Sequence, residues 1–274
     1  MKKNVLIVNF NTQKLTDACI KSVNKTTPGC TIYVFDNSDK EPFINKFDNV
    51  EVIDNTEGHI IDFEKWLDEY PNRKRSGGKT NNWGSAKHAY TVEKCMETIS
   101  TDEFILLDSD VLLKKDISGL FDSQFAYAAE VQEQDPRTKI KRVLPFICYI
   151  NNKMCKENNI HYFSDDYMHG LRKTAKSDWY DTGAYFYLAC EKFPHKEIKW
   201  EDYVVHYKAG SWTSAADKMR KTKHLTVDEW LKKYRSLWDE NYEEPEISQE
   251  EKPKEQAAIA KISPTIPKYP QNRR

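Results

Sequence analysis

Short apolar runs and one amphipathic segment alternate along the first part of the chain. Residues 4–10 form the first apolar run, residues 31–35 the second and residues 50–53 a third. Between the first two runs, residues 12–24 carry apolar side chains at helical spacing. A strand, a helix and two further strands in this order predict the opening of a parallel α/β sheet.

Asparagine or aspartate follows each of these predicted strands. Asn9 and Asn11 stand at the end of the first, Asp36 at the end of the second and Asp54 at the end of the third. Such residues form good turns, which is the simpler explanation for any one of them. Because the carboxyl ends of parallel strands share the sheet edge where α/β folds bind ligands, three in succession indicate a ligand crevice.

The chain is organised around residues 101–113, TDEFILLDSDVLL. The continuous apolar run over 104–107 is typical of a strand buried on both faces of a parallel sheet. It ends in Asp108-Ser109-Asp110. Two carboxylates one residue apart suit a hard divalent cation whose shell is completed by diphosphate oxygens and water. An Asp-x-Asp triplet also arises by chance, so its place after a buried strand gives it weight.

The rest of the chain predicts less regular elements. We expect helices over 60–70, 81–98 and 213–240, and strands over 119–131 and 141–150. Pro145 within the last strand predicts an edge or bulged strand, since proline has no N–H for the ladder. From residue 243 the chain is rich in Glu, Lys and Pro. This composition cannot bury a core and predicts a flexible or partner-draped tail.

Composition and charge exclude several environments. The net charge is −1, from 42 basic and 43 acidic residues, so no general field attracts nucleic acid. Six cysteines occur without a Cys-x-x-Cys pair, which argues against a zinc site and against a disulfide framework. The first apolar run is too short for a signal peptide, and no run approaches the ~18 apolar residues that span a bilayer. The sequence predicts a soluble, cytoplasmic protein.

In chain order, the Asn-rich end of the first strand, Asp36, the Asp108-Ser109-Asp110 triplet and the late string HYKAGSW at 206–212 resemble the GT-A fold glycosyltransferases. The resemblance is greatest to the family 2-like enzymes of polysaccharide and surface-glycan synthesis. It implies an α/β, Rossmann-like fold with a mostly parallel central sheet flanked by helices and a C-terminal helical extension. The resemblance covers roughly residues 4–212 and does not extend to the tail. Together with the periodicity and composition of the C-terminal part, it predicts a catalytic domain over 1–212, a helical segment over 213–242 and a flexible or partner-draped tail over 243–274.

The resemblance implies roles for individual residues. The nucleotide contacts are Asn9, Phe10, Asn11, Asp36 and Asp108, and the metal ligands for Mn²⁺ or Mg²⁺ are Asp108, Asp110 and His206. Lysines can stabilise a departing diphosphate, for which Lys208 and Lys87 are candidates. An ordinary amphipathic helix start explains Lys87 and His88 equally well.

Asp181 is the candidate general base of an inverting reaction. Many family 2 members carry Glu-Asp at this step, whereas this chain has Asp-Thr-Gly, so Asp181 could instead orient the acceptor or cap a helix. The pairs 165–166 and 201–202 are competing acids. The string at 206–212 also resembles one found in retaining GT-A families, which leaves inversion or retention open.

The implied function is transfer of a hexosyl group from a nucleoside diphosphate donor, with a UDP-sugar favoured, to a glycan or lipid-linked acceptor. A non-catalytic protein that binds glycan or nucleotide sugar stays open. A haloacid-dehalogenase phosphatase is disfavoured because Leu112 stands where that family has Thr or Val, and a sugar nucleotidyltransferase because no glycine-rich loop follows Val8. Peripheral association with the inner membrane face and a homo-oligomer also stay open.

Overall fold

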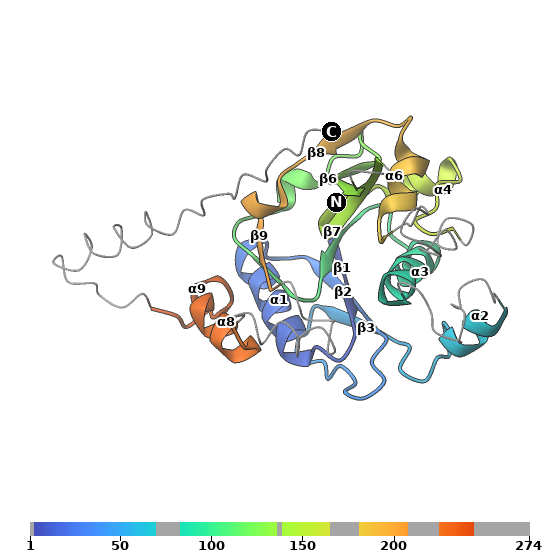
Figure 1. Ribbon diagram of the computed structural model, residues 1–274. Coiled ribbons are helices and arrows are strands. Elements are labelled where there is room, and N and C mark those ends of the chain that lie inside the picture. The colour runs from blue at the N-terminus through green and yellow to red at the C-terminus, as the bar shows by residue number, and fades with distance from the viewer. Residues whose placement is uncertain (1–2, 70–82, 136–138, 165–180, 208–224, 244–274) are drawn as a thin grey trace, which may run out of the picture. The chain divides into compact units, whose positions relative to one another are not determined.

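The computed structural model describes residues 3–69, 83–135, 139–164, 181–207 and 225–243 (Figure 1). Contacts divide the chain into a unit of residues 1–240 and a unit of residues 241–274, and all elements below belong to the first. The strands are β1 (Asn4–Asn9), β2 (Thr31–Asp36), β3 (Val50–Asp54), β4 (Phe104–Asp108), β5 (Val111–Leu113), β6 (Tyr127–Asp135), β7 (Ile140–Ile150), β8 (His195–Glu197) and β9 (Val204–His206). The helices are α1 (Gln13–Thr26), α2 (Phe63–Glu69), α3 (Trp83–Thr98), α4 (Asn152–Glu157), α6 (Ala184–Cys190), α8 (Val227–Lys233) and α9 (Arg235–Trp238), with 3₁₀ turns η2 (Ser118–Leu120) and η3 (Trp200–Asp202).

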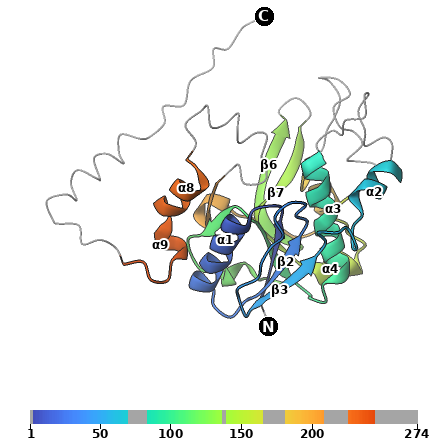
Figure 2. The same cartoon turned by 90° about the horizontal axis from the view of Figure 1, so that it is seen from below.

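Seven strands form the central sheet in the order β3-β2-β1-β4-β7-β6-β8. The first four of these run parallel, β7 runs antiparallel to both of its neighbours, and β8 runs parallel to β6. A separate two-stranded sheet pairs β5 with β9. The expected α/β fold with a mostly parallel central sheet flanked by helices is confirmed (Figures 1 and 2).

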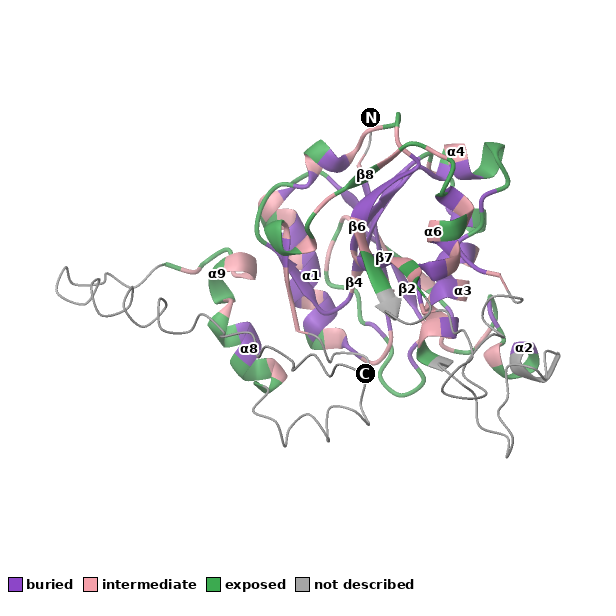
Figure 3. Cartoon of the chain, turned by 45° about the horizontal axis from the view of Figure 1, so that its top comes forward, coloured by how far each residue is buried: buried purple, intermediate pink, exposed green. Residues whose placement is uncertain are grey.

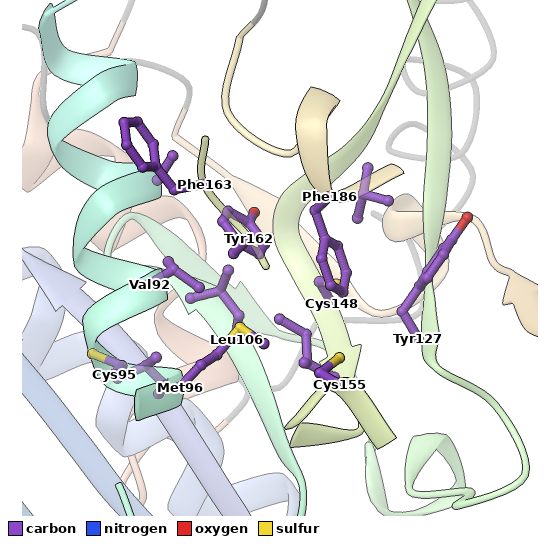
Figure 4. Packing of buried hydrophobic residues seen from close by; sticks show 14 of the residues in the cluster. Val92, Cys95, Met96, Leu106, Tyr127, Cys148, Cys155, Tyr162, Phe163 and Phe186 are labelled. Atoms are coloured by element: carbon purple, nitrogen blue, oxygen red, sulfur yellow. The ribbon is translucent and has the colours of Figure 1, made fainter. Parts of the chain in front are cut away.

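Successive side chains of the central strands enter two different cores. Ile7 and Ile105 lie in a core with residues of α1, whereas Leu6 and Leu106 lie in a core with residues of α3, α4 and α6. Figure 3 shows the buried residues along these strands, and Figure 4 shows the second core, in which the Phe186 ring of α6 lies beside Cys148 of β7. Because both faces of the strands are covered, the apolar runs in the sequence are continuous.

Pro145 lies in a central strand, so the expected edge position is wrong. Residues 147–150 of β7 pair with β4, and β7 pairs with β6 on its other side. The register between β6 and β7 shifts between Ala129 and Val131, opposite the stretch that contains Pro145. The expected bulge is confirmed, since the irregular stretch tolerates the missing N–H.

Two expected elements differ from the observed ones. The strand expected over 119–131 starts only at Tyr127, because Asp122 accepts a hydrogen bond from the Gln124 N–H at 3.3 Å and stabilises a turn before it. The helix expected over 213–240 is seen in its second half as α8 and α9. These meet at Tyr234, whose φ of −106° and ψ of 25° end the first helix. Residues 213–224 lie outside the described residues.

The C-terminal helices pack on α1. Trp230 of α8 is buried in a cluster with Leu15 of α1. Lys25 of α1 donates to the carbonyl oxygens of Ser236 at 2.8 Å and Asp239 at 3.0 Å, at the end of α9. An ammonium group is favourable there because the last carbonyls of a helix carry partial negative charge.

Replacing Thr226 by alanine is expected to lower the free energy of unfolding by ~1 kcal/mol. Thr226 forms a capping box at the start of α8: its hydroxyl accepts from the Glu229 N–H at 3.2 Å, and the Glu229 carboxylate accepts from the Thr226 N–H at 2.8 Å. The midpoint of thermal unfolding followed by circular dichroism should fall by about 2–4 °C. Thr226→Ser keeps the hydroxyl and should melt close to wild type; an equal loss in both variants would show that the cap does not stabilise α8.

Candidate functional site

Parallel pairing places polar residues from three strands at one edge of the sheet. Asp108 at the end of β4 pairs with Val8 of β1, and the next residue, Asn9, pairs with Asp36 of β2. Asp36 pairs in turn with Asp54 of β3. The polar strand ends expected from the sequence therefore meet where α/β sheets bind ligands.

Two short strands bring a histidine to the two aspartates. Val111 of β5 pairs with His206 of β9, and the Tyr207 N–H donates to the Asp110 carbonyl oxygen at 2.9 Å. His206 Nε2 lies 2.9 Å from Asp110 Oδ1 and 4.0 Å from Asp108 Oδ2. One ligand atom from each of these three side chains lies within 4.8 Å of the others. The structure thus brings together the three residues predicted to hold a metal.

The donor set of this triad fits a divalent cation. Burial, and then the charge of Asp110, raise the pKa of Asp108 to about 7, while His206 and Arg142 oppose the rise. Two buried carboxylates side by side are costly unless a cation neutralises them. Carboxylate oxygens suit Mg²⁺ and Mn²⁺, and the imidazole nitrogen shifts the preference toward the transition metal, Mn²⁺.

Asn9 and Asp36 form a buried hydrogen-bond network behind the triad. Asn9 Nδ2 donates to Asp36 Oδ1 at 2.8 Å and to Ser38 Oγ at 3.0 Å. Asn9 Oδ1 accepts from the Thr12 hydroxyl at 2.8 Å, and that hydroxyl lies 3.1 Å from Ser109 Oγ, between the two aspartates. In this structure Asn9 and Asp36 hold the loops around the site. Their direct contact with a nucleotide stays a prediction.

Phe10 and Asn11 follow β1 at the same edge, and Lys87 of α3 lies beside Phe10. Asn11 adopts a φ of 55°, and its side-chain oxygen accepts two backbone N–H groups of the loop after β2. Lys87 Nζ lies 5.3 Å from the centre of the Phe10 ring and 5.0 Å from that of Phe63. Burial lowers the pKa of Lys87, and neighbouring carboxylates oppose this shift. A partly desolvated ammonium of this kind suits phosphate oxygens.

Asp181 is held by protein donors from three directions. Arg142 of β7 donates to Asp181 Oδ2, the Ser85 hydroxyl of α3 donates to Oδ1, and the Thr182 N–H donates to Oδ1 at 2.8 Å. We call Ser85, His88, Arg142, Asp181 and Thr182 the Arg142–Asp181 cluster. A general base needs an oxygen directed at the acceptor hydroxyl, whereas both oxygens of Asp181 are directed at protein groups.

His88 connects this cluster with the triad. His88 Nδ1 lies 3.1 Å from the Thr182 hydroxyl, and His88 Nε2 lies 3.6 Å from Asp108 Oδ1. Burial lowers the pKa of His88 to about 4, against the opposing charge of Asp181, so the imidazole is neutral at pH 7. The cluster and the triad are therefore parts of one polar assembly.

The remaining candidates are Lys208 and two pairs of acids. Lys208, a predicted nucleotide ligand, is outside the described residues, and so are the competing acids Asp165 and Asp166. The other competing pair, Glu201 and Asp202, is exposed in η3. The roles of these residues stay predictions.

The sequence alone does not indicate that Arg142, Ser85 and Phe146 contact the site. Arg142 follows Lys141 in a strand with no local motif, and it meets Asp181 only because α6 packs on β7. Phe146 contacts the His206 ring, with the two ring centres 4.1 Å apart, and so fixes the imidazole. A charged residue in a largely apolar strand is the only signal that the sequence offers for Arg142.

No protein-family model matches the sequence, and no curated protein is significantly similar to it. Among solved structures, the chain is similar to the galactosyltransferase LgtC in complex with donor and acceptor sugar analogs, with 13% identity over 89% of this chain and 98% of that chain and a TM-score of 0.51. It also matches the apo-form glycosyltransferase GlyE of Streptococcus pneumoniae TIGR4, with 13% identity over 73% of this chain and a TM-score of 0.43. A third match is the bifunctional glycosyltransferase WbbM, with 11% identity over 81% of this chain and a TM-score of 0.44. The chain spans 45% of the length of GlyE and 44% of WbbM.

The fold is GT-A-like. The match to LgtC extends over nearly the whole length of both chains, and the central sheet is the mostly parallel one that the sequence resemblance implied. At this level of identity the match shows the fold alone, because unrelated functions share folds. The residues at the carboxyl edge of the sheet, and not the fold, indicate the chemistry.

Proposed function

We propose that the protein is a metal-dependent glycosyltransferase. It transfers a hexosyl group from a nucleoside diphosphate donor, with UDP favoured, to a glycan or lipid-linked acceptor. The observation that carries the proposal is the Asp108–Asp110–His206 triad at the carboxyl edge of a GT-A-like sheet. That LgtC was solved with donor and acceptor sugar analogs supports the same substrate class.

The triad would hold Mn²⁺ or Mg²⁺, which supplies Lewis-acid stabilisation to the diphosphate leaving group. The residues of the chain do the rest. Lys87 adds positive charge near the phosphates, and Phe146 keeps the His206 ring in place. Asn9 and Thr12 fix the turn that carries Asp108 and Asp110, through the contact of the Thr12 and Ser109 hydroxyls.

We also propose a division of the chain into three parts. The catalytic domain spans residues 1–212, a helical segment spans 213–242, and the tail over 243–274 is flexible or draped over a partner. No helix in the described part of the chain is long and apolar enough to cross a membrane. We place the protein in the cytoplasm, where a lipid-linked acceptor would bring it to the inner membrane face.

The testing experiment measures binding and slow hydrolysis of a panel of UDP-, GDP-, ADP- and CDP-sugars in Mn²⁺, Mg²⁺ or EDTA. We expect one donor to bind and hydrolyse only with metal. Isothermal titration gives the affinities, and release of the nucleoside diphosphate gives the turnover.

Two other outcomes have distinct meanings. Binding with no hydrolysis and no transfer to any glycan acceptor would favour the alternative, a non-catalytic protein that binds nucleotide sugar or glycan. Failure to bind any nucleotide in the presence of metal would exclude the transferase.

Replacing Lys87 by methionine is expected to weaken the affinity for the nucleoside diphosphate by about tenfold, since a charge-assisted hydrogen bond is worth ~1.5 kcal/mol or more. Methionine keeps an unbranched apolar side chain but loses the ammonium group that lies over the Phe10 and Phe63 rings. The measurement is titration of the nucleotide with Mn²⁺ present. Lys94→Met, on the same helix but paired with Glu97, is the matched control and should bind like wild type. Equal affinities for the two variants would remove Lys87 from the site.

A further inference from the structure

Three buried polar atoms lie around the Arg142–Asp181 cluster without a hydrogen-bond partner among the described residues. They are Arg142 Nε, His88 Nε2 and Tyr162 Oη. Buried polar groups in native proteins are nearly always hydrogen-bonded, so each exception needs an explanation. They come from β7, α3 and the segment after α4. Arg142 and His88 are joined through Asp181, Ser85 and Thr182, so a polar ligand bound at the cluster would complete them.

The three atoms belong to one region of the molecule. Arg142 donates to Asp181, and His88 Nε2 lies 3.6 Å from Asp108. The Tyr162 ring stacks on Phe186 of α6, the helix that follows Asp181, with the ring centres 5.0 Å apart, and burial raises the pKa of Tyr162 well above its usual value. Tyr162 therefore keeps its proton and presents a hydroxyl donor.

The charge balance of the region limits the ligand. Arg142 and Asp181 are each about one-fifth exposed and form an ion pair, so the guanidinium charge is already compensated. A carboxylate on the ligand would be repelled by Asp181 and Asp108. Hydroxyl groups on the ligand both donate and accept hydrogen bonds without adding charge. The unsatisfied atoms thus fit the hydroxyl groups of a neutral sugar.

We propose that the Arg142–Asp181 cluster binds the hydroxyl groups of the transferred sugar and that its ion pair selects a neutral hexose over a uronate. The inference rests on the proposed function and names its donor class. Asp181 is then a positioning residue that holds Arg142 and balances its charge, because its oxygens already accept from Ser85, Thr182 and Arg142. This replaces the base role that the sequence suggested.

The test compares UDP, UDP-glucose, UDP-galactose, UDP-glucuronate and UDP-galacturonate by titration with Mn²⁺. We expect wild type to bind the neutral sugars at least tenfold more tightly than the matching uronates. Asp181→Asn leaves the charge of Arg142 uncompensated. In this variant the ratio of the affinity for a neutral donor to the affinity for the matching uronate should fall at least tenfold. Arg142→Met leaves the charge of Asp181 uncompensated and should widen it. Affinity for UDP itself should stay within about twofold in both variants.

The two variants are expected to change the preference for neutral donors in opposite directions. Damage to the fold would change it in the same direction in both variants and would also weaken the binding of UDP. Equal affinity of wild type for neutral and uronate donors would overturn the inference, and so would a change of this preference in the same direction in both variants. The proposed function would stand in either case as long as UDP binds. If UDP and the other nucleoside diphosphates fail to bind with Mn²⁺, the proposed function fails and the inference with it. If one variant does not fold, the sign of the other still decides.

Discussion

Replacing Asp110 by asparagine is expected to abolish metal-dependent nucleotide binding and to lower kcat/KM for sugar transfer by at least about 10³-fold. The side chain keeps its shape but loses the charge that completes the triad with Asp108 and His206. A bound cation contributes several kcal/mol of transition-state stabilisation, and each 1.36 kcal/mol is tenfold in rate. No other variant proposed for this chain removes so large a part of the chemistry.

The substitution Asp110→Asn should lower thermal stability only relative to the wild type with metal and nucleotide bound. With Mn²⁺ and nucleotide at about a hundred times the dissociation constant, the melting temperature of wild type should rise by about 5–10 °C. Asp110→Asn should show no such rise, while its unliganded form should melt at or above the wild-type temperature because one of two adjacent like charges is gone. Asp48→Asn, at an exposed position, is the control. A metal-dependent rise retained in Asp110→Asn would exclude the triad as the metal site.

The parts of this fold that the sequence predicts are those with local causes. The runs at 4–10 and 104–107 are apolar on both faces because helices cover both sides of β1 and β4. Asp108 and Asp110 could be placed at the sheet edge because that edge follows from strand order and direction alone. The bulge at Pro145 likewise follows from a missing N–H.

The remaining features depend on pairings between distant segments. His206 reaches Asp110 through the antiparallel pairing of β5 with β9, across 96 positions of sequence. Arg142 reaches Asp181 only because α6 packs on β7. Asn9 and Asp36 show the converse case, since residue type suggested ligand contact and the structure shows hydrogen bonds within the protein. Residue type indicates which interactions a side chain can form. Only the packing shows whether its partner is a ligand or another residue of the protein.

Replacing Gly183 by alanine is expected to lower the free energy of unfolding by about 3 kcal/mol or more. Gly183 precedes α6 with a φ of +78°, and a Cβ there would lie 2.0 Å from the carbonyl oxygen of Val143. The left-handed conformation alone costs an L-residue roughly 1–2 kcal/mol, and a clash with backbone cannot be relieved by a rotamer change. Thermal unfolding should show a midpoint lowered by about 6–12 °C. Gly84→Ala is the matched control, because nothing lies within 4 Å of a Cβ at that helical position, and it should stabilise the protein by up to about 1 kcal/mol.

The same substitution should separate sugar binding from nucleotide binding. The Val143 N–H donates to the Gly183 carbonyl oxygen at 3.1 Å, and these residues adjoin Arg142 and Thr182 in the chain. Moving the turn away from β7 therefore pulls Asp181 from Arg142, while the triad residues at β4, β9 and the turn before β5 keep the pairing of β5 with β9. In the folded fraction of Gly183→Ala, we expect UDP to bind with Mn²⁺ as in wild type and the preference for neutral over uronate donors to disappear. A preference that survived the displaced turn would show that selectivity lies outside the Arg142–Asp181 cluster, whose ion pair joins Asp181 directly to β7.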